Sequence, residues 1–335
     1  MTIQTPFGVR LAGTGSAVPP GILTNADLEK MIDTSDEWIR KRTGISERRI
    51  CDPDKGEGAL DLECRAITSA LDAAGMQASD LDLLIVGSLT SEMRCPSNAC
   101  RVSQIIGAEP AGAFDLNAAC CGFVYSMNIA DSLIRSGRHR AIGVIGCDVL
   151  SPFIDYTERT VSILFGDAAG AAVVVRDDEH PELGCIYQRV EANGNGWENL
   201  YMPNHERDLH PDAVPCEAAL GNLRMNGREV YKFAVKKFQY VIEDALEQTG
   251  LSVDDISQFV CHQSNIRMIE SAKEKIGLPD EKVHINIDRY GNSSAGSVGL
   301  CLDQLWRTGK VKSGDNVVLV AFGAGMTWSS SVWRV

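Results

Sequence analysis

The chain has 335 residues, of which 44% are hydrophobic and 23% are charged. This is ordinary globular composition, and the length suits two domains or one large α/β unit rather than a disordered or fibrous protein. The formal net charge of −13 disfavours a general nucleic-acid-binding protein, because phosphate binding requires a basic surface.

The cysteine content predicts a reducing compartment. The 11 cysteines are an odd number, with no Cys-x-x-Cys pair and no Cys/His spacing typical of zinc. Residues 1–10 lack the apolar region of a signal peptide, and the apolar run at 168–175 is too short to cross a bilayer. We therefore expect a soluble cytoplasmic protein that binds neither membrane nor nucleic acid.

The first half of the chain alternates predicted strands and helices. A polar, proline-bearing segment at 177–181 separates it from the rest, so the predicted halves are 1–178 and 179–335. Hydrophobic periodicity, caps and stop signals predict the following elements: a strand at 9–13, short helices beginning near Asn25 and Thr34, a helix at 60–75, a strand at 81–88, a helix at 98–106, a helix from Ala118 to about Ser136, and strands at 141–146 and 171–175.

The second half follows a similar order. Residues 193–221 have little periodicity and resemble a loop. The remaining predicted elements are a strand at 186–191, a helix at 228–249, a strand at 258–261, a helix at 265–276, a strand at 283–285, a helix at 295–308 and a strand at 316–322.

The order of elements repeats at an offset of about 175 positions. Residues 70–86 align with 245–261, and the helix end at 133–137 with its following strand aligns with 305–322. A shared helix–strand order indicates duplication of one α/β unit. If the copies pack about a pseudo-two-fold axis, loops at corresponding strand ends meet in one pocket.

Three polar residues lie at such corresponding ends. Cys120 is at a strand-to-helix turn, where backbone N–H groups and the helix dipole would stabilise a thiolate. His262 follows the strand at 258–261, and Asn292 lies in the second-half counterpart of the Cys120 turn. Each has a structural alternative: a buried packing thiol, a hydrogen-bonded core histidine, and an asparagine that only shapes a turn. The small segment 323–325 is either a tight corner or a source of backbone N–H groups for an oxyanion.

Four segments carry a family resemblance. They are 114–120 (Phe-Asp-Leu-Asn-Ala-Ala-Cys), 262–267 (His-Gln-Ser-Asn-Ile-Arg), 291–295 (Gly-Asn-Ser-Ser-Ala) and 321–328, and two more lie at 34–45 and 165–171. In order and spacing, from about residue 9 to the C-terminus, the chain resembles β-ketoacyl-acyl-carrier-protein synthase III. The resemblance implies a thiolase-like fold with two duplicated α/β halves in a five-layered α-β-α-β-α arrangement, usually as a homodimer.

The resemblance also implies a reaction. Cys120 would attack an acyl-CoA primer and form an acyl-enzyme, with the backbone N–H groups of Cys120 and Ala324 holding the oxyanion. Malonyl-acyl carrier protein would follow, and His262 and Asn292 would donate hydrogen bonds to its thioester oxygen as carbon dioxide leaves. The enolate would attack the acyl group on Cys120 and give 3-oxoacyl-acyl carrier protein, without a metal or redox cofactor.

The substrate contacts are implied in the same way. Trp38 would stack on the CoA adenine with Arg159 on its other face, Arg42 and Thr43 would lie nearby, and Asn265 would line the pantetheine channel. The implied docking patch for an acidic carrier protein consists of Arg267, Lys232, Lys236, Lys237, Lys273 and Lys275.

Two positions depart from the family pattern. Ala324 stands where relatives commonly have glycine, and alanine would be strained there if the backbone required a positive φ. Cys95 stands where relatives often have a bulky apolar residue that reaches the partner subunit's acyl pocket. We therefore expect a roomier pocket that accepts primers beyond acetyl.

Other functions remain open from the sequence alone. Related enzymes with this Cys-His-Asn set form esters or amides, or condense two acyl-CoAs in specialised lipid or polyketide metabolism. A cysteine thioester hydrolase that uses Cys120 and His262 is a more distant alternative, and a catalytically silent acyl-binding protein would carry no covalent label on Cys120.

Overall fold

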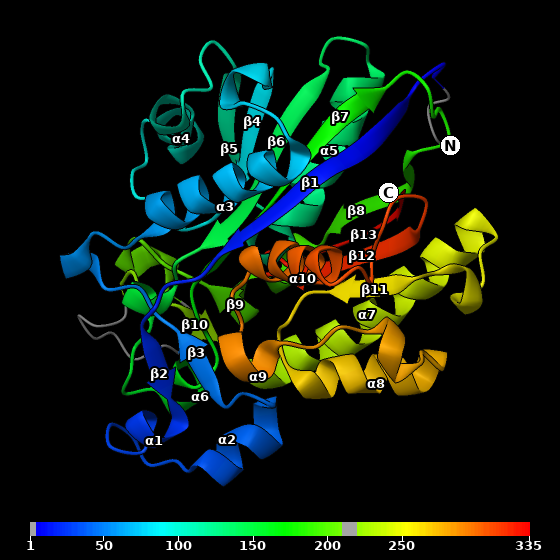
Figure 1. Ribbon diagram of the computed structural model, residues 1–335. Helices are drawn as coiled ribbons and strands as arrows, with labels where there is room; N and C mark the ends of the chain where they lie inside the picture. Colours follow the sequence, from blue (N-terminus) through cyan, green and yellow to red (C-terminus); the bar gives the residue numbers. More distant parts are fainter. Residues whose placement is uncertain (1–4, 210–219) are drawn as a thin grey trace.

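The computed structural model describes residues 5–209 and 220–335 and has two β-sheets that flank a central pair of helices (Figure 1). The larger sheet has the order β1-β7-β6-β4-β5, and the smaller one the order β11-β12-β13-β8. The strands of these two sheets are β1 (Gly8–Ala17), β4 (Leu83–Gly87), β5 (Gly112–Leu116), β6 (Ala141–Asp148), β7 (Ala168–Asp177), β8 (Gly184–Ala192), β11 (Gln258–Cys261), β12 (Asn316–Gly323) and β13 (Thr327–Arg334).

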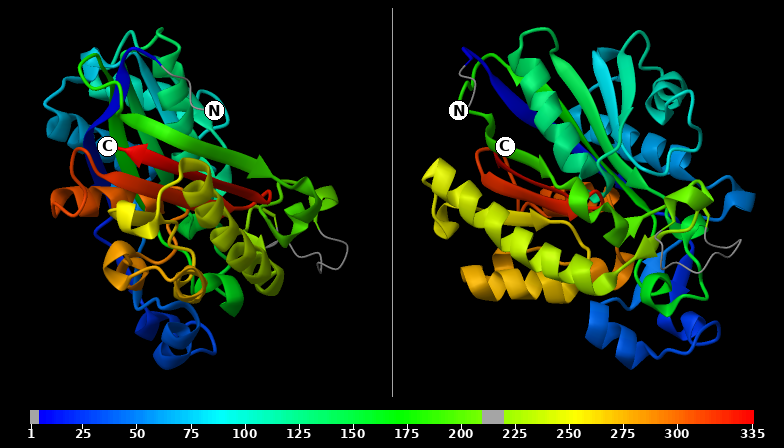
Figure 2. Two further views of the ribbon diagram at one scale, coloured as in Figure 1. Left: turned by 90° about the vertical axis from the view of Figure 1, so that its right-hand side faces the viewer. Right: turned by 180° about the vertical axis from the view of Figure 1, so that it is seen from behind.

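The helices complete five layers. Helices α3 and α4 cover the outer face of the larger sheet, α5 and α10 lie between the sheets, and α7 and α8 cover the smaller sheet (Figures 1 and 2). This is the predicted α-β-α-β-α arrangement. The α-helices are α1 (Asn25–Leu28), α2 (Asp36–Thr43), α3 (Ala59–Ala74), α4 (Asn98–Ile106), α5 (Gly122–Arg135), α6 (Arg159–Ser162), α7 (Gly227–Thr249), α8 (Ile266–Ile276), α9 (Ile287–Tyr290) and α10 (Gly296–Arg307).

Short 3₁₀ turns and small strand pairs connect these layers. The strand pairs are β2 (Ile22–Thr24) with β3 (Glu47–Arg49) and β9 (Leu200–Tyr201) with β10 (Arg224–Met225). The 3₁₀ turns are η1 (Pro53–Lys55), η2 (Ala78–Asp80), η3 (Ala119–Cys121), η4 (Ser151–Phe153), η5 (Gly194–Asn199), η6 (Glu206–Asp208), η8 (Val253–Asp255) and η9 (Asp280–Lys282).

The predicted duplication is present in the structure. The helix, 3₁₀ turn and strand α3–η2–β4 recur as α7–η8–β11, and both β4 and β11 have parallel neighbours. The larger sheet takes all its strands from residues 8–177 and the smaller one from 184–334. The link between β7 and β8 therefore contains the predicted boundary between the halves.

Close backbone contacts allow the central helices to lie against the larger sheet. A Cβ atom added to Gly87 would lie 2.5 Å from the carbonyl of Gly122, and one added to Gly170 would lie 2.3 Å from the backbone of Gly299. Glycine is required at these crossings because any side chain would displace the helix. The approach of Gly122 to Gly87 brings the N-terminal end of α5, and Cys120 just before it, to the C-terminal end of β4.

Two local expectations were wrong, and one long strand was not predicted. The helix predicted from Ala118 begins at Gly122, after the 3₁₀ turn η3. Residues 283–285 do not form a strand, and only Val283 makes an isolated bridge to Phe259. Strand β13 was not predicted, because its Ser329-Ser330-Ser331 run reads as exposed although all three residues are fully buried between β12 and β8.

Candidate active site

One cavity of about 890 Å³ brings the predicted catalytic residues together. Cys120 reaches it from η3, His262 from the end of β11, and Asn292 from the loop between α9 and α10. The predicted CoA contacts Trp38, Arg42, Thr43, Arg159 and Asn265 also line it, as do Arg267 and Lys232. The duplicated fold therefore collects residues more than 100 positions apart around one space.

Cys120 is buried, and its sulfur accepts a hydrogen bond. The Ser294 hydroxyl donates to the sulfur at 3.3 Å, and this bond and the backbone N–H groups of Cys120 and Ala324 act to lower the pKa of the thiol. Burial outweighs them and raises the pKa of Cys120 to about 12, because a buried charge loses its hydration. This direction is opposite to the easily ionised thiol that the strand-to-helix turn predicted.

His262 and Asn292 are fixed by neighbouring serines. The His262 Nδ1 atom lies 2.7 Å from the Ser297 hydroxyl oxygen, and its ring packs edge-on against Phe322 with centroids 5.5 Å apart. Burial lowers the pKa of His262 to about 3, so the ring is neutral. The backbone N–H of Ser294 donates to Asn292 Oδ1 at 2.9 Å, which leaves the Asn292 amide NH₂ free to donate toward the cavity.

Ala324 is not in a strained conformation. The two described non-glycine residues with positive φ are Ala119 and Ser294, whereas the corner at 323–325 places its positive φ, 129°, at Gly325. The backbone N–H of Ala324 acts to lower the pKa of the Cys120 thiol, so it lies close to the sulfur. Ala324 does not have a positive φ, so the backbone strain expected for alanine at this position is absent.

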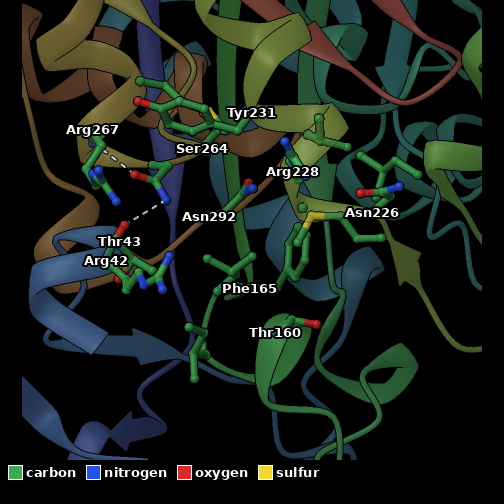
Figure 3. Close-up of a pocket in the computed structure, with 18 of the residues that line it drawn as sticks. Arg42, Thr43, Thr160, Phe165, Asn226, Arg228, Tyr231, Ser264, Arg267 and Asn292 are labelled. Atoms are coloured by element: carbon green, nitrogen blue, oxygen red, sulfur yellow. Dashed lines mark hydrogen bonds between the residues drawn. The ribbon is translucent and has the colours of Figure 1, made fainter. Parts of the chain in front are cut away.

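The mouth of the cavity is basic. Arg42, Arg159, Arg228 and Arg267 are exposed there, and no described carboxylate lies within ion-pair distance of any of them. Figure 3 shows Arg42 on one side of the pocket, Arg267 near it and Arg228 toward the Asn226 side. The Asn265 side chain joins α8 to α2 by donating to the Arg42 carbonyl at 3.1 Å.

Two arginine side chains lie against the Trp38 ring. The guanidinium of Arg159 lies 4.6 Å from the centre of the Trp38 ring, and that of Arg42 lies 5.3 Å from it. A separation of 4.6 Å leaves no room for another ring, since aromatic stacking alone needs about 3.5 Å on each side of an inserted ring. An adenine between Trp38 and Arg159 therefore requires Arg159 to move.

The predicted docking residues differ in availability. Lys236 and Lys275 are exposed, and Lys232 pairs with Glu229 at 2.7 Å. Lys273 is nearly buried, with 8% of its side chain exposed, and pairs with Glu270 and Asp280. Lys237 lies 3.5 Å from the Trp328 ring centre. Lys273 and Lys237 are therefore engaged within the protein and are poor candidates for a docking surface.

Cys95 does not line the cavity of its own chain. It is exposed, in the segment before α4. Ser294 and Ser297, which contact the sulfur and the imidazole, were not among the predicted site residues. The hydroxyl-rich run at 293–297 indicates a functional loop, but only the fold determines which hydroxyls turn inward.

The fold and this cysteine-centred pocket are those of the thiolase-fold condensing enzymes, which are acyltransferases. Residues 114–194 match the family described as 3-oxoacyl-[acyl-carrier-protein (ACP)] synthase III, and residues 246–335 match its C-terminal region. The chain belongs to this family.

Individual relatives cover nearly the whole chain. The chain is 45% identical to the β-ketoacyl-[acyl-carrier-protein] synthase III of Caldanaerobacter subterraneus over 322 residues, 96% of each chain. The structure is similar to that of 3-oxoacyl-[acyl-carrier-protein] synthase III from Aquifex aeolicus, with a TM-score of 0.89, 39% identity, and 98% and 100% of the two chains covered. It is also similar to the priming β-ketosynthase of the R1128 polyketide pathway, with a TM-score of 0.90, 33% identity, and 100% and 98% covered.

Proposed function

We propose that this enzyme joins an acyl group from acyl-CoA to the two-carbon unit of malonyl-acyl carrier protein, the condensation that initiates fatty-acid synthesis. The observation that carries the proposal is the convergence of Cys120, His262 and Asn292 on one cavity with a basic mouth. A nucleophile beside fixed polar groups suits acyl transfer, and arginines at the entrance suit the phosphates of CoA.

In the first half-reaction the Cys120 sulfur attacks the primer's thioester carbonyl. The backbone N–H groups of Cys120 and Ala324, which act on the resting sulfur, would donate to the carbonyl oxygen as it becomes negative. Collapse of the tetrahedral adduct breaks the carbon–sulfur bond to CoA and leaves the acyl group on Cys120. The apolar lining of Ile163, Leu200 and Met326 would hold the acyl chain away from water.

In the second half-reaction the malonyl thioester binds in the same cavity. The free amide NH₂ of Asn292 donates to the thioester oxygen, where charge accumulates as carbon dioxide leaves, so the donor stabilises the enolate more than the ground state. His262 is the second polar group beside it. The enolate carbon attacks the acyl carbon, the bond from that carbon to the Cys120 sulfur breaks, and the departing sulfur takes a proton from solvent to regenerate the thiol. These steps need no metal and no redox cofactor.

The carrier protein would dock beside the cavity mouth. Arg267 and Lys232 line the cavity, and Lys236 and Lys275 are exposed further along α7 and α8, where the four could meet an acidic partner. This basic patch accounts for recognition of an acidic carrier by a chain whose net charge is −13.

A homodimer and a cytoplasmic location complete the proposal. Strand β5 is an edge strand, and Phe114 on it and Ile105 in α4 are large apolar residues that remain exposed, as expected for a surface that a second copy covers. The described cysteines are free thiols, including the exposed Cys95 and Cys100, which suits a reducing compartment. No helix in the described ranges is long and apolar enough to span a membrane.

Labelled acetyl-CoA followed by malonyl-acyl carrier protein tests the function. We expect a covalent label on Cys120 that the second substrate discharges as 3-oxoacyl product. The Cys120→Ala variant should take no label, whereas Cys121→Ala, which removes an adjacent buried thiol bonded to Thr327, should still be labelled. Release of free acid without malonyl consumption would indicate a hydrolase, and transfer to an alcohol or amine would indicate another acyltransferase.

A further inference from the structure

The hydroxyl of Ser297 determines which nitrogen of His262 carries the proton. Its oxygen lies 2.7 Å from His262 Nδ1 and 2.8 Å from the carbonyl oxygen of Ser294. A carbonyl oxygen can only accept, so the single hydroxyl proton is directed to Ser294. The serine oxygen must then accept from the ring, which requires hydrogen on Nδ1. The backbone N–H of Gln263, 3.4 Å away, also points at this oxygen, as expected for an acceptor.

We propose that Ser297 is a positioning residue that holds neutral His262 with hydrogen on Nδ1 and a lone pair on Nε2, so that the ring acts as the general base for the Cys120 thiol. In neutral imidazole only one nitrogen carries hydrogen, so the two ring edges have opposite roles. Among the described residues no other group bonds to the ring, and His262 itself lines the cavity. The chemical role rests on the proposed function, whereas the tautomer does not.

The composition of the cavity wall supports a base at this position. No aspartate or glutamate is among the described residues that line it, and its arginines and Lys232 are cations. The imidazole is therefore the one lining side chain in the described ranges with a lone pair on nitrogen available to accept a proton. Asn292 has the opposite role to His262. The Asn292 Oδ1 atom accepts from the Ser294 N–H, so the Asn292 NH₂ group is the part that can donate into the cavity.

The proton moves in a balanced way during acylation. Burial raises the pKa of Cys120 and lowers that of His262, so the resting pair is a neutral thiol and a neutral ring rather than an ion pair. As the Cys120 sulfur bonds to the thioester carbon, the thiol proton passes to His262 Nε2. The π electrons of the thioester carbonyl move onto its oxygen, which becomes negatively charged. When the bond to CoA breaks, the departing sulfur takes that proton from Nε2 and leaves as CoA thiol. The predicted donation from His262 to a thioester oxygen is then possible only while the ring is protonated.

Nitrogen-15 NMR of the histidine-labelled enzyme tests the tautomer without substrate. The chain has 6 histidines, and loss of signals in His262→Ala assigns the ring. We expect a protonated Nδ1 and an unprotonated Nε2 for His262 at neutral pH. The opposite pattern, with hydrogen on Nε2, would overturn the proposal, and this measurement needs no variant of Ser297 to fold.

Ser297→Ala and Ser297→Thr extend the test to reactivity. We expect alanine to mix the two tautomers and to slow alkylation of Cys120 by iodoacetamide at pH 7 about 10-fold, and threonine to restore both. Ser126→Ala is the matched control, since Ser126 is a buried helical serine whose hydroxyl has no partner. An unchanged tautomer and alkylation rate in Ser297→Ala would refute the positioning role. Failure of the malonyl condensation assay alone, with these results intact, would count against the proposed function and not against Ser297.

Discussion

Ala119 and Ser294 lie 175 positions apart and share a left-handed backbone, with φ of 47° and 48°. This conformation costs a non-glycine residue on the order of 1 kcal/mol, so the fold maintains it twice. Ala119 directly precedes Cys120, and Ser294 bonds to the Cys120 sulfur and supports Asn292. The two turns are equivalent parts of the duplicated unit, one carrying the nucleophile and the other its polar partners.

Cys120 should be a neutral thiol at physiological pH. Because burial raises its pKa to about 12, the protonated form persists below that pH and the thiolate appears only in alkaline solution. We expect the difference in ultraviolet thiolate absorbance between the wild type and Cys120→Ala to be absent at pH 7 and to grow as the pH rises. The other cysteines cancel in this difference. A clear thiolate signal at pH 7 would support the helix-dipole interpretation instead.

The sequence was sufficient to predict the duplication. The offset of about 175 residues aligned α3–β4 with α7–β11, and the corresponding strand ends indicated Cys120, His262 and Asn292, which line one cavity in the structure. Periodicity and turn residues are local signals, so they can be recognised before the fold is known. The order of the motifs along the chain then indicated the family.

The features that the sequence did not reveal depend on long-range packing. Lys273 appears in a basic helix, but its neighbours Glu270 and Asp280 hold it almost buried. Burial raises the pKa of Cys120, and this burial depends on elements that are distant in the sequence and pack around the sulfur. Likewise, the sequence shows Ser297 only as a serine in a predicted helix, because its contact with His262 depends on how β11 packs against α10.

Trp38→Ala should weaken binding of the CoA portion and leave the chemical step unchanged. The Trp38 ring lies 4.6 Å from the guanidinium of Arg159. Replacing Trp38 with alanine removes an aromatic surface on which the adenine would stack, and such stacking contributes about 1–3 kcal/mol per base. We expect KM for acetyl-CoA to rise about 5- to 100-fold with kcat nearly unchanged. Trp197→Ala, an exposed tryptophan outside the cavity lining, is the control. A fall in kcat with constant KM would contradict a binding role.

Charge reversal at Arg267 should separate carrier docking from acylation. Arg267→Glu places a negative charge on the proposed docking surface, so we expect KM for malonyl-acyl carrier protein to rise at least several-fold, with a weaker effect at high salt. Labelling of Cys120 by acetyl-CoA should persist. Lys275→Glu should act in the same direction.

Lys273→Ala provides the contrasting case for that surface. Because Lys273 is held by Glu270 and Asp280, its loss should lower the free energy of unfolding by about 1 kcal/mol rather than alter carrier affinity. Denaturant unfolding and the carrier KM measure the two effects. A carrier defect in Lys273→Ala as large as that in Arg267→Glu would return Lys273 to the docking surface.

Glu63→Gln should stabilise the protein more as the pH rises. Glu63 is a fully buried residue of α3, where desolvation and then nearby Asp115 and Glu92 raise its pKa well above the usual value. An acid with a raised folded pKa loses stability as the pH climbs above the unfolded pKa, because the unfolded chain releases the proton first. Glutamine keeps an acceptor for the Asn98 amide without this cost. Unfolding free energies at pH 5 and pH 8 should diverge, and a larger benefit at pH 5 would contradict this account.

Cys95→Phe should narrow primer choice. Cys95 is exposed and lies outside its own chain's cavity, in the segment between β4 and α4. From the family resemblance we propose that its side chain enters the acyl pocket of the partner subunit. Phenylalanine would fill space that cysteine leaves open. We expect the wild type to accept acyl-CoAs longer than acetyl, and Cys95→Phe to retain acetyl-CoA while losing the longer primers at least 10-fold in kcat/KM. Cys100→Phe, at an exposed position on α4, controls for added bulk. Wild-type activity with acetyl-CoA alone would refute the roomier pocket, and an unchanged chain-length profile in Cys95→Phe would place the limit elsewhere in the cavity wall.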